Sequence, residues 1–190
     1  MSVPTDRLPP LPQDRLDAAQ RAAADELIAG PRKGVKGPFI PLLRSPELLA
    51  RVQKLGEYLR FNSVLSPRVS EFATLIVSRA WSQQFEWAVH VPLALKAGTS
   101  EATIAALREG RRPDAMDDDE ACVHDFAMEL LQARGVGDAS YQAALQRFGE
   151  RGVVELTSLI GYFAMVSMVL NVAHTPAESG NVEALPALPR

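Results

Sequence analysis

Hydrophobic residues recur every three to four positions along most of the chain, and this spacing predicts helices. The segments that show it are 13–28, 46–62, 67–80, 82–98, 99–108, 118–133, a short stretch after Asp138, and 153–172. No segment alternates hydrophobic and polar residues in the way a half-buried strand does. The pattern therefore predicts an all-α fold with about seven or eight helices.

Proline and glycine mark where the predicted helices begin and stop. Ser45-Pro46 and Ser66-Pro67 each place a capping residue before a proline at the first helical position. Pro92 lies inside the segment 82–98 and should kink or break that helix. The Gly- and Pro-rich stretch 30–41 should be a loop, residues 1–13 an extended arm, and residues 175–190 a tail.

The chain has 190 residues, of which 47% are hydrophobic. This length and composition fit a single soluble domain, 1–190, with a core of its own. The segment 153–172 is apolar enough to raise the question of a membrane span. It carries Glu155 and several other polar residues, so we expect a buried helix, of the kind that can be shared with a neighbouring subunit, and no membrane partner.

Charge and cysteine content exclude several classes of function. The formal net charge is -3 and no basic stripe is present, so a nucleic acid partner is not expected. The one cysteine, Cys122, excludes an intrachain disulfide, a dithiol redox centre and a cysteine-rich metal site. This use of cysteine agrees with a cytoplasmic location.

The candidate chemistry lies in the stretch SQQFEWAVH, residues 82–90. Glu86 and His90 are four residues apart, so on a helix they point to the same side. A carboxylate beside an imidazole orients the ring and raises its pKa, which suits acid–base catalysis. By spacing alone, the commoner interpretation of the pair is an ordinary surface ion pair or a core histidine. Glu71 lies among apolar neighbours in the preceding helix. Because burying an acid without a purpose costs stability, this position favours a functional role for the pair.

The ordered series SPRVSEFATLIVSRAWSQQFEWAVHVPLALKAGTSEATIAALREG resembles the carboxymuconolactone decarboxylase family of the alkylhydroperoxidase D-like superfamily. The resemblance covers a core of about 46–110. It implies an alkylhydroperoxidase D-like helical fold, a homo-oligomer often built on trimers, and a small pocket around Glu71, Gln83, Glu86 and His90.

The resemblance also separates two branches of chemistry. The peroxidase branch carries a Cys-x-x-Cys pair, and Gln83 and Glu86 stand at those two places. Neither residue forms a thiolate, so hydroperoxidase activity is disfavoured. The decarboxylase branch keeps an acid four residues before the histidine, as Glu86 and His90 do. No organic cofactor is implied.

The leading hypothesis is a lyase that acts on a small carboxylated or lactone-type compound, such as those of aromatic catabolism. His90 would donate a proton, Glu86 would orient it, and Glu71 would be a second acid–base group. Gln83 and Trp87 are candidate substrate contacts. Lys33, with Arg32 and Lys36 in the Gly/Pro loop, is a candidate for binding a substrate carboxylate.

Several alternatives stay open at the sequence level. The chain can be a non-catalytic oligomeric binding or scaffold protein that has kept the fold. A metal site of two carboxylates and one histidine can be formed by Glu71, Glu86 and His90. The favoured expectation is a site that holds no metal. The preferred interpretation of His174 is a residue that is stabilised by its position at a helix end. The preferred interpretation of His124 is a residue on a solvated face.

Overall fold

The computed structural model describes residues 5–177 and 182–186. Over these residues the chain forms helices and no strand, which confirms the predicted all-α class. A short 3-10 helix covers Gln13–Arg15. The α-helices of the described residues are α1 (Ala18–Ala29), α2 (Phe39–Leu42), α3 (Pro46–Phe61), α4 (Pro67–Ala80), α5 (Gln84–Ala97), α6 (Glu101–Arg108), α7 (Asp118–Ala133) and α8 (Asp138–Ala173).

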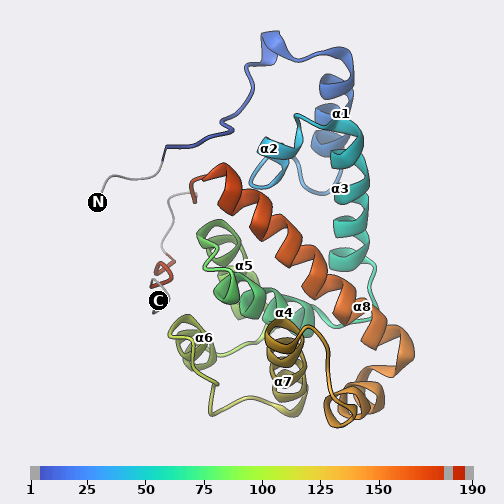
Figure 1. The fold of residues 1–190 in the computed structure, drawn as a ribbon, viewed down its shortest axis with the longest axis vertical. Helices are drawn as coiled ribbons and strands as arrows, with labels where there is room; N and C mark the ends of the chain where they lie inside the picture. The colour runs from blue at the N-terminus through green and yellow to red at the C-terminus, as the bar shows by residue number, and fades with distance from the viewer. Residues whose placement is uncertain (1–4, 178–181, 187–190) are drawn as a thin grey trace.

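Helix α8 crosses the molecule diagonally between two groups of helices (Figure 1). On one side α1 and α2 pack against α3, and α3 contacts α8. On the other side α4 packs against α5, α7 and α8. Every residue of α4 from Phe72 to Arg79 is buried, including the polar Thr74, Ser78 and Arg79. Helix α4 is therefore the fixed frame on which α5 and its side chains are held.

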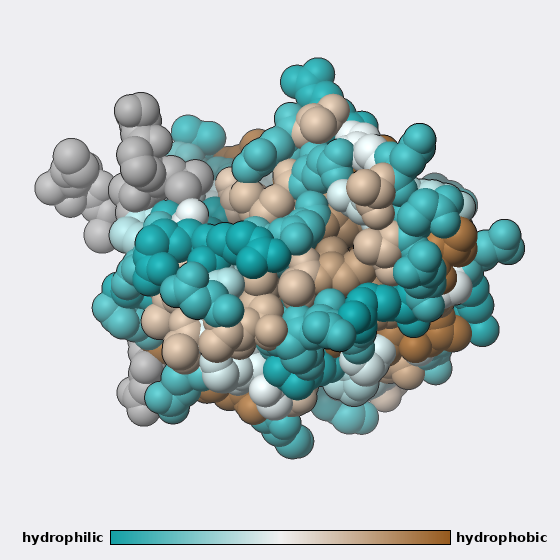
Figure 2. Space-filling view, turned by 90° about the horizontal axis from the view of Figure 1, so that it is seen from below, coloured by the Kyte–Doolittle hydropathy of each residue, from teal (hydrophilic) through white to brown (hydrophobic). Residues whose placement is uncertain are grey.

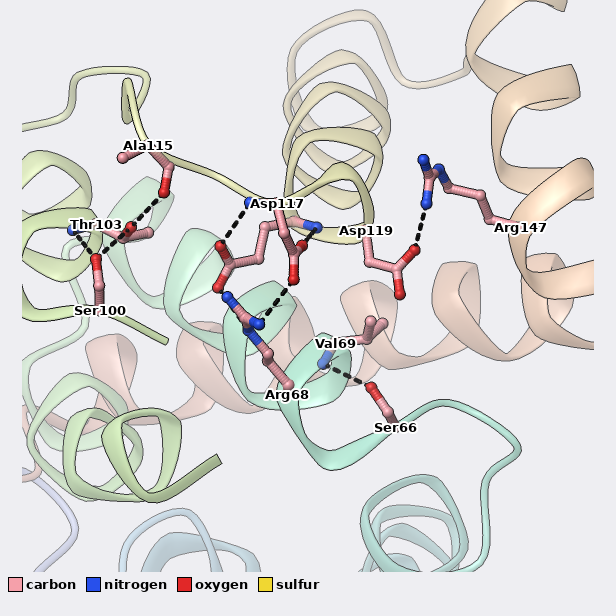
Figure 3. Close-up of polar contacts among 10 residues, drawn as sticks. Ser66, Arg68, Val69, Ser100, Thr103, Ala115, Asp117, Asp119 and Arg147 are labelled. Carbon is pink, nitrogen blue, oxygen red and sulfur yellow. Dashed lines mark hydrogen bonds and ion pairs between the residues drawn. The ribbon is translucent and has the colours of Figure 1, made fainter. Parts of the chain in front are cut away.

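Side-chain caps set several helix starts. Of the two predicted caps, Ser66 caps α4 with its side chain, whereas Ser45 precedes α3 without a side-chain capping hydrogen bond. The Ser66 hydroxyl accepts a hydrogen bond from the Val69 amide, and Asp17 and Asp117 each form a capping box. Arg68 from α4 also reaches the start of α7, with its guanidinium 2.7 Å from the Asp117 carboxylate (Figure 3). This contact ties the two helices together at their N-terminal ends.

Two predicted boundaries were wrong. The segment 13–28 is split, because Asp17 caps a new helix after the 3-10 turn. The predicted loop 30–41 ends in the short helix α2, whose Phe39 and Leu42 are buried. At Pro92, where a kink or a break was predicted, α5 does not break and runs on to Ala97. The missing amide of Pro92 costs one hydrogen bond, and the buried Trp87, Val91 and Ala94 hold the helix in place around it.

The described parts of the predicted arm and tail are packed against the fold. The Arg7 amide donates a 2.8 Å hydrogen bond to the Ala173 carbonyl. Leu185 is buried, and its backbone exchanges two hydrogen bonds with the Gln84 side chain. Residues 182–186 therefore form a strap on α5 and α6, where a free tail was predicted. Residues 1–4, 178–181 and 187–190 lie outside the described residues.

The long helix α8 combines the short and the long helix predicted after Asp138. Gly149 joins them in a left-handed conformation with φ 68°. By length and composition alone α8 is able to cross a membrane. In the fold, 61% of its most apolar 18-residue window is buried against the other helices. Its hydrophobicity is thus largely used in packing, in line with the expected buried helix.

Candidate active site

Helices α4 and α5 bring two carboxylates to opposite sides of one imidazole. The Nδ1 atom of His90 lies 2.5 Å from Glu71 Oε2, and its Nε2 atom lies 3.3 Å from Glu86 Oε2. Glu86 is one turn before His90 on α5, whereas Glu71 comes from α4. The packing of these two helices therefore completes a Glu–His–Glu centre.

The centre is buried, and its charges determine its protonation. His90 is 2% exposed, and the Glu86 and Glu71 side chains are 5% and 15% exposed. Burial has the largest effect on His90 and lowers its pKa. The hydrogen bonds and charges of Glu71 and Glu86 outweigh burial, so the net pKa of His90 is raised above its ordinary value. The imidazole is thus held ready to carry a proton.

A cavity of about 380 Å³ opens on one side of this centre. Glu86 and His90 line it, and Phe163 of α8 meets the His90 ring edge-on with ring centroids 5.0 Å apart. The rest of the wall is aromatic and cationic. It includes Phe39, Phe61, Phe85, Tyr162, Arg32, Lys36 and Arg60. The cavity is therefore shaped for a small compound that has both an apolar body and negative charge.

Tyr162 occupies the wall between α3 and α8. Its hydroxyl lies 3.4 Å from a terminal nitrogen of Arg32, and burial raises the pKa of its phenol. Gly56 of α3 packs beneath these two side chains, and a methyl group there would overlap the Tyr162 hydroxyl. The glycine allows α3 to approach α8 closely enough to form this side of the cavity.

Three predicted substrate contacts lie away from the cavity lining. The Gln83 side chain caps α5 by accepting from the Phe85 amide and donates 2.9 Å to Asn171. The Trp87 indole donates to the Glu183 carbonyl and is packed on the strap side of α5. Lys33 is exposed, while its neighbours Arg32 and Lys36 line the cavity. In this structure Gln83 and Trp87 hold α5 in place. Of the three loop cations predicted as candidates, Arg32 and Lys36 line the cavity and Lys33 does not.

Sequence reasoning missed Arg60 and Phe163 as cavity residues. Arg60 occupies the last turn of α3, where a basic residue is expected for helix stability alone. Phe163 lies in the apolar run of α8 and has no mark that separates it from core residues. Only the crossing of these helices places both side chains in the wall of the cavity that His90 lines.

The remaining histidines and the cysteine lie elsewhere. His174 ends α8 with φ 56°, and His124 on α7 lies 3.1 Å from Asp125. His124 is buried, where a solvated face was predicted. Burial raises the pKa of the Cys122 thiol, which makes it a poor nucleophile. None of the three lines the cavity.

The Glu–His–Glu centre is arranged as a hydrogen-bonded relay. A metal ligand must offer a ring nitrogen lone pair to the ion. Both nitrogens of His90 face carboxylates, and among the described residues no group of His, Cys, Asp and Glu side chains is placed to hold a metal. The geometry thus favours acid–base chemistry over the two-carboxylate metal site.

The fold and the site define an all-helical protein with an acid–imidazole–acid centre beside a small cavity. Residues 46–123 match the model of the carboxymuconolactone decarboxylase family, which confirms the resemblance predicted from the sequence. The match contains Glu71, Glu86 and His90, and it extends beyond the predicted core into α7. It supports a carboxymuconolactone decarboxylase-like or alkylhydroperoxidase-like function at the level of the family. A search of curated proteins gave no match to the chain.

Proposed function

We propose that the protein is an acid–base enzyme of the decarboxylase type that acts on a small carboxylated or lactone-type compound. The observation that carries this proposal is His90, which lies between two carboxylates at the wall of a cavity. A buried imidazole with a raised pKa is suited to deliver a proton near neutral pH.

In the proposed reaction a carbon–carbon bond to a substrate carboxylate breaks and CO2 leaves. The electron pair of that bond passes into the conjugated carbonyl or lactone of the substrate, so no organic cofactor is needed. His90 then donates the proton on Nε2 to the carbanionic carbon, and the product is the decarboxylated compound. The carboxylate of Glu86 beside Nε2 stabilises the imidazolium that makes this donation.

Glu71, predicted as a second acid–base group, contacts the ring nitrogen Nδ1 and lies outside the cavity lining. It borders a separate surface hollow with Arg68 and Lys96. Its short contact with Nδ1 fixes the ring orientation and keeps the imidazole basic. From this position it can return a proton from solvent to His90 after each turnover.

The proposal is tested by measuring CO2 release from carboxymuconolactone. We expect turnover by the natural protein and a loss of about 10²–10⁴-fold in the His90→Ala variant, the range that a general acid contributes. His174→Asn is the matched control, since His174 is a histidine outside the cavity lining and asparagine tolerates its positive φ. Circular dichroism verifies that each variant is folded.

Equal turnover by the His90→Ala variant would contradict the acid–base role. No CO2 release from carboxymuconolactone or from other small carboxylated lactones, with a folded protein, would favour a binding or scaffold function. The hydroperoxidase alternative lacks its dithiol, because Gln83 and Glu86 stand at the two places and the chain has one cysteine. A peroxidase rate that survives Cys122→Ser would require a different centre.

A further inference from the structure

We propose that Arg32 and Arg60 form an anion subsite in the cavity, which binds a carboxylate attached to a planar unsaturated ring. This inference rests on the proposed function, because it assigns the substrate class for the same cavity. The subsite places an anchoring group of the substrate on one wall, while Glu86 and His90 form another part of the lining.

Both arginines lack the anionic partner that their position calls for. Neither makes an ion pair with any described residue, and the Nε atom of each is buried without a hydrogen-bond partner. The hydrogen bond between Arg32 and Tyr162, at 3.4 Å, is long. A half-buried guanidinium without a counter-charge is costly, so a pair of them at one cavity indicates a bound anion.

Most other arginines of the fold are satisfied by the protein itself. Ion pairs with carboxylates hold Arg51, Arg68, Arg108, Arg111, Arg112, Arg147 and Arg151. Backbone carbonyls accept from Arg44 and Arg79. Arg79 also has a buried Nε atom without a partner, but its Nη1 atom donates to the Pro186 carbonyl. Arg32 and Arg60 differ from all of these because no described carboxylate or backbone carbonyl accepts from them, and both line the candidate active-site cavity.

Electrostatics point to the same conclusion. Burial has the largest effect on Arg32 and lowers its pKa, and the neighbouring charge of Arg60 lowers it further. The Tyr162 oxygen and, as the smallest effect, the charge of Glu86 act in the opposite direction. Lys36 adds a third cation to the cavity wall. A carboxylate bound here would offset this repulsion, and the planar guanidinium fork matches its two oxygens.

The aromatic residues define the body of the ligand. Arg32 stacks over the Phe39 ring at 4.4 Å, and Arg60 lies 5.1 Å from the Phe61 ring centroid. Phe85 and Phe163 complete the apolar wall. These faces suit a flat ring. The bound carboxylate is therefore the group that stays on the compound, since an ion pair stabilises it against loss as CO2.

The test measures binding of benzoate by titration calorimetry, with benzamide and acetate as comparison ligands. Benzamide keeps the ring without the charge, and acetate keeps the charge without the ring. We expect saturable benzoate binding at millimolar or lower concentration and weaker binding of both comparison ligands. The Arg32→Gln and Arg60→Gln variants should each bind benzoate about tenfold more weakly, from loss of one charge-assisted contact.

Two matched controls separate the subsite from general charge effects. Lys33→Gln removes the exposed cation next to Arg32, and Arg51→Gln removes an exposed arginine from the same helix as Arg60. Both should bind benzoate as the natural protein does. Thermal unfolding of each variant verifies folding. The buried Nε atom of Arg60 has no hydrogen-bond partner among the described residues, so the Arg60→Gln variant remains informative if Arg32→Gln is unstable.

The subsite is wrong if benzoate does not bind, if benzamide binds equally well, or if both arginine variants keep full affinity. Acetate binding as tight as benzoate would overturn the assignment of a ring. The His90→Ala variant separates this inference from the proposed chemistry, since it should lose CO2 release and keep benzoate binding. If benzoate binding depends on the arginines but the natural protein releases no CO2 from any small carboxylated lactone, the subsite is supported and the proposed acid–base enzyme is refuted.

Discussion

His90 contacts two carboxylates that differ in their surroundings. Glu86 is almost fully buried and lines the cavity, whereas Glu71 is partly exposed and lies behind the ring. The hydrogen bond to Glu71 is the largest of the effects that raise the His90 pKa. Glu71 thus positions and charges the imidazole without lining the cavity, and its role can be separated from that of Glu86.

The change Glu71→Gln should lower the pKa of His90, because it removes one negative charge and leaves burial in place. We expect turnover at neutral pH to fall about 10- to 100-fold. Proton NMR titration of the ring signals measures the pKa directly, since the chain has three histidines. His124, which pairs with Asp125, serves as the internal control. An unchanged His90 titration would contradict the assigned role of Glu71.

The raised pKa of His90 also determines the direction in which the stability of the fold changes with pH. The folded pKa of His90 is raised, so its protonation stabilises the fold fully below the ordinary value of 6.5. This contribution is lost as the pH rises through the higher folded pKa. It should be smaller in Glu71→Gln, and denaturant unfolding across this pH range measures the difference.

At the scale of elements, Glu155 of α8 fastens the turn between α3 and α4. Its carboxylate accepts hydrogen bonds from the Tyr58 and Ser63 hydroxyls, the Val64 amide and the Arg151 guanidinium, at 2.6–2.7 Å. Burial raises its pKa, and these four donors outweigh burial and lower the pKa to about 2. The turn that leads into α4, which carries Glu71, is therefore anchored by one acid.

The change Glu155→Gln should lower the free energy of unfolding by about 2–3 kcal/mol, because the buried charge-assisted hydrogen bonds are weakened. In the natural protein this stabilisation is present above the unfolded pKa of 4.5 and is lost as the pH falls toward 2. Urea unfolding at neutral and acid pH measures both effects. The exposed neighbour Glu150→Gln should leave stability unchanged, and an equal loss there would refute the anchor.

At the scale of the whole molecule, α3 and α8 present apolar side chains to solvent. Leu55 and Tyr58 border a groove with Val154, and Val154 is 64% exposed. Met168 and Val172 continue the exposed apolar side of α8. Figure 2 shows hydrophobic residues at the surface among a mainly hydrophilic face. We propose that copies of the chain associate through this side of α3 and α8.

The change Val154→Asp should dissociate this assembly, because it places a charge in an apolar interface. Light scattering after size-exclusion chromatography gives the mass of each form. The matched control is Leu95→Asp, at an exposed apolar position on α5. A natural protein that runs as a monomer, or an assembly that Val154→Asp leaves intact, would contradict the proposed interface.

The sequence by itself determined the helices and the pairing of Glu86 with His90. Both depend on spacing within one helix, where residues four apart share a face. The same rule explains one failure: Trp87 is next to Glu86, so it points to a different side and packs under the strap.

Only the tertiary structure decided which distant residues meet. Glu71 is 19 residues from His90, and the packing of α4 on α5 brings them into contact. Arg60 of α3 and Phe163 of α8 reach the cavity through helix crossings, and the loop before α2 contributes Arg32 in place of Lys33. Periodicity fixes the face on which a side chain lies, and the packing of the hydrophobic faces fixes what that face meets.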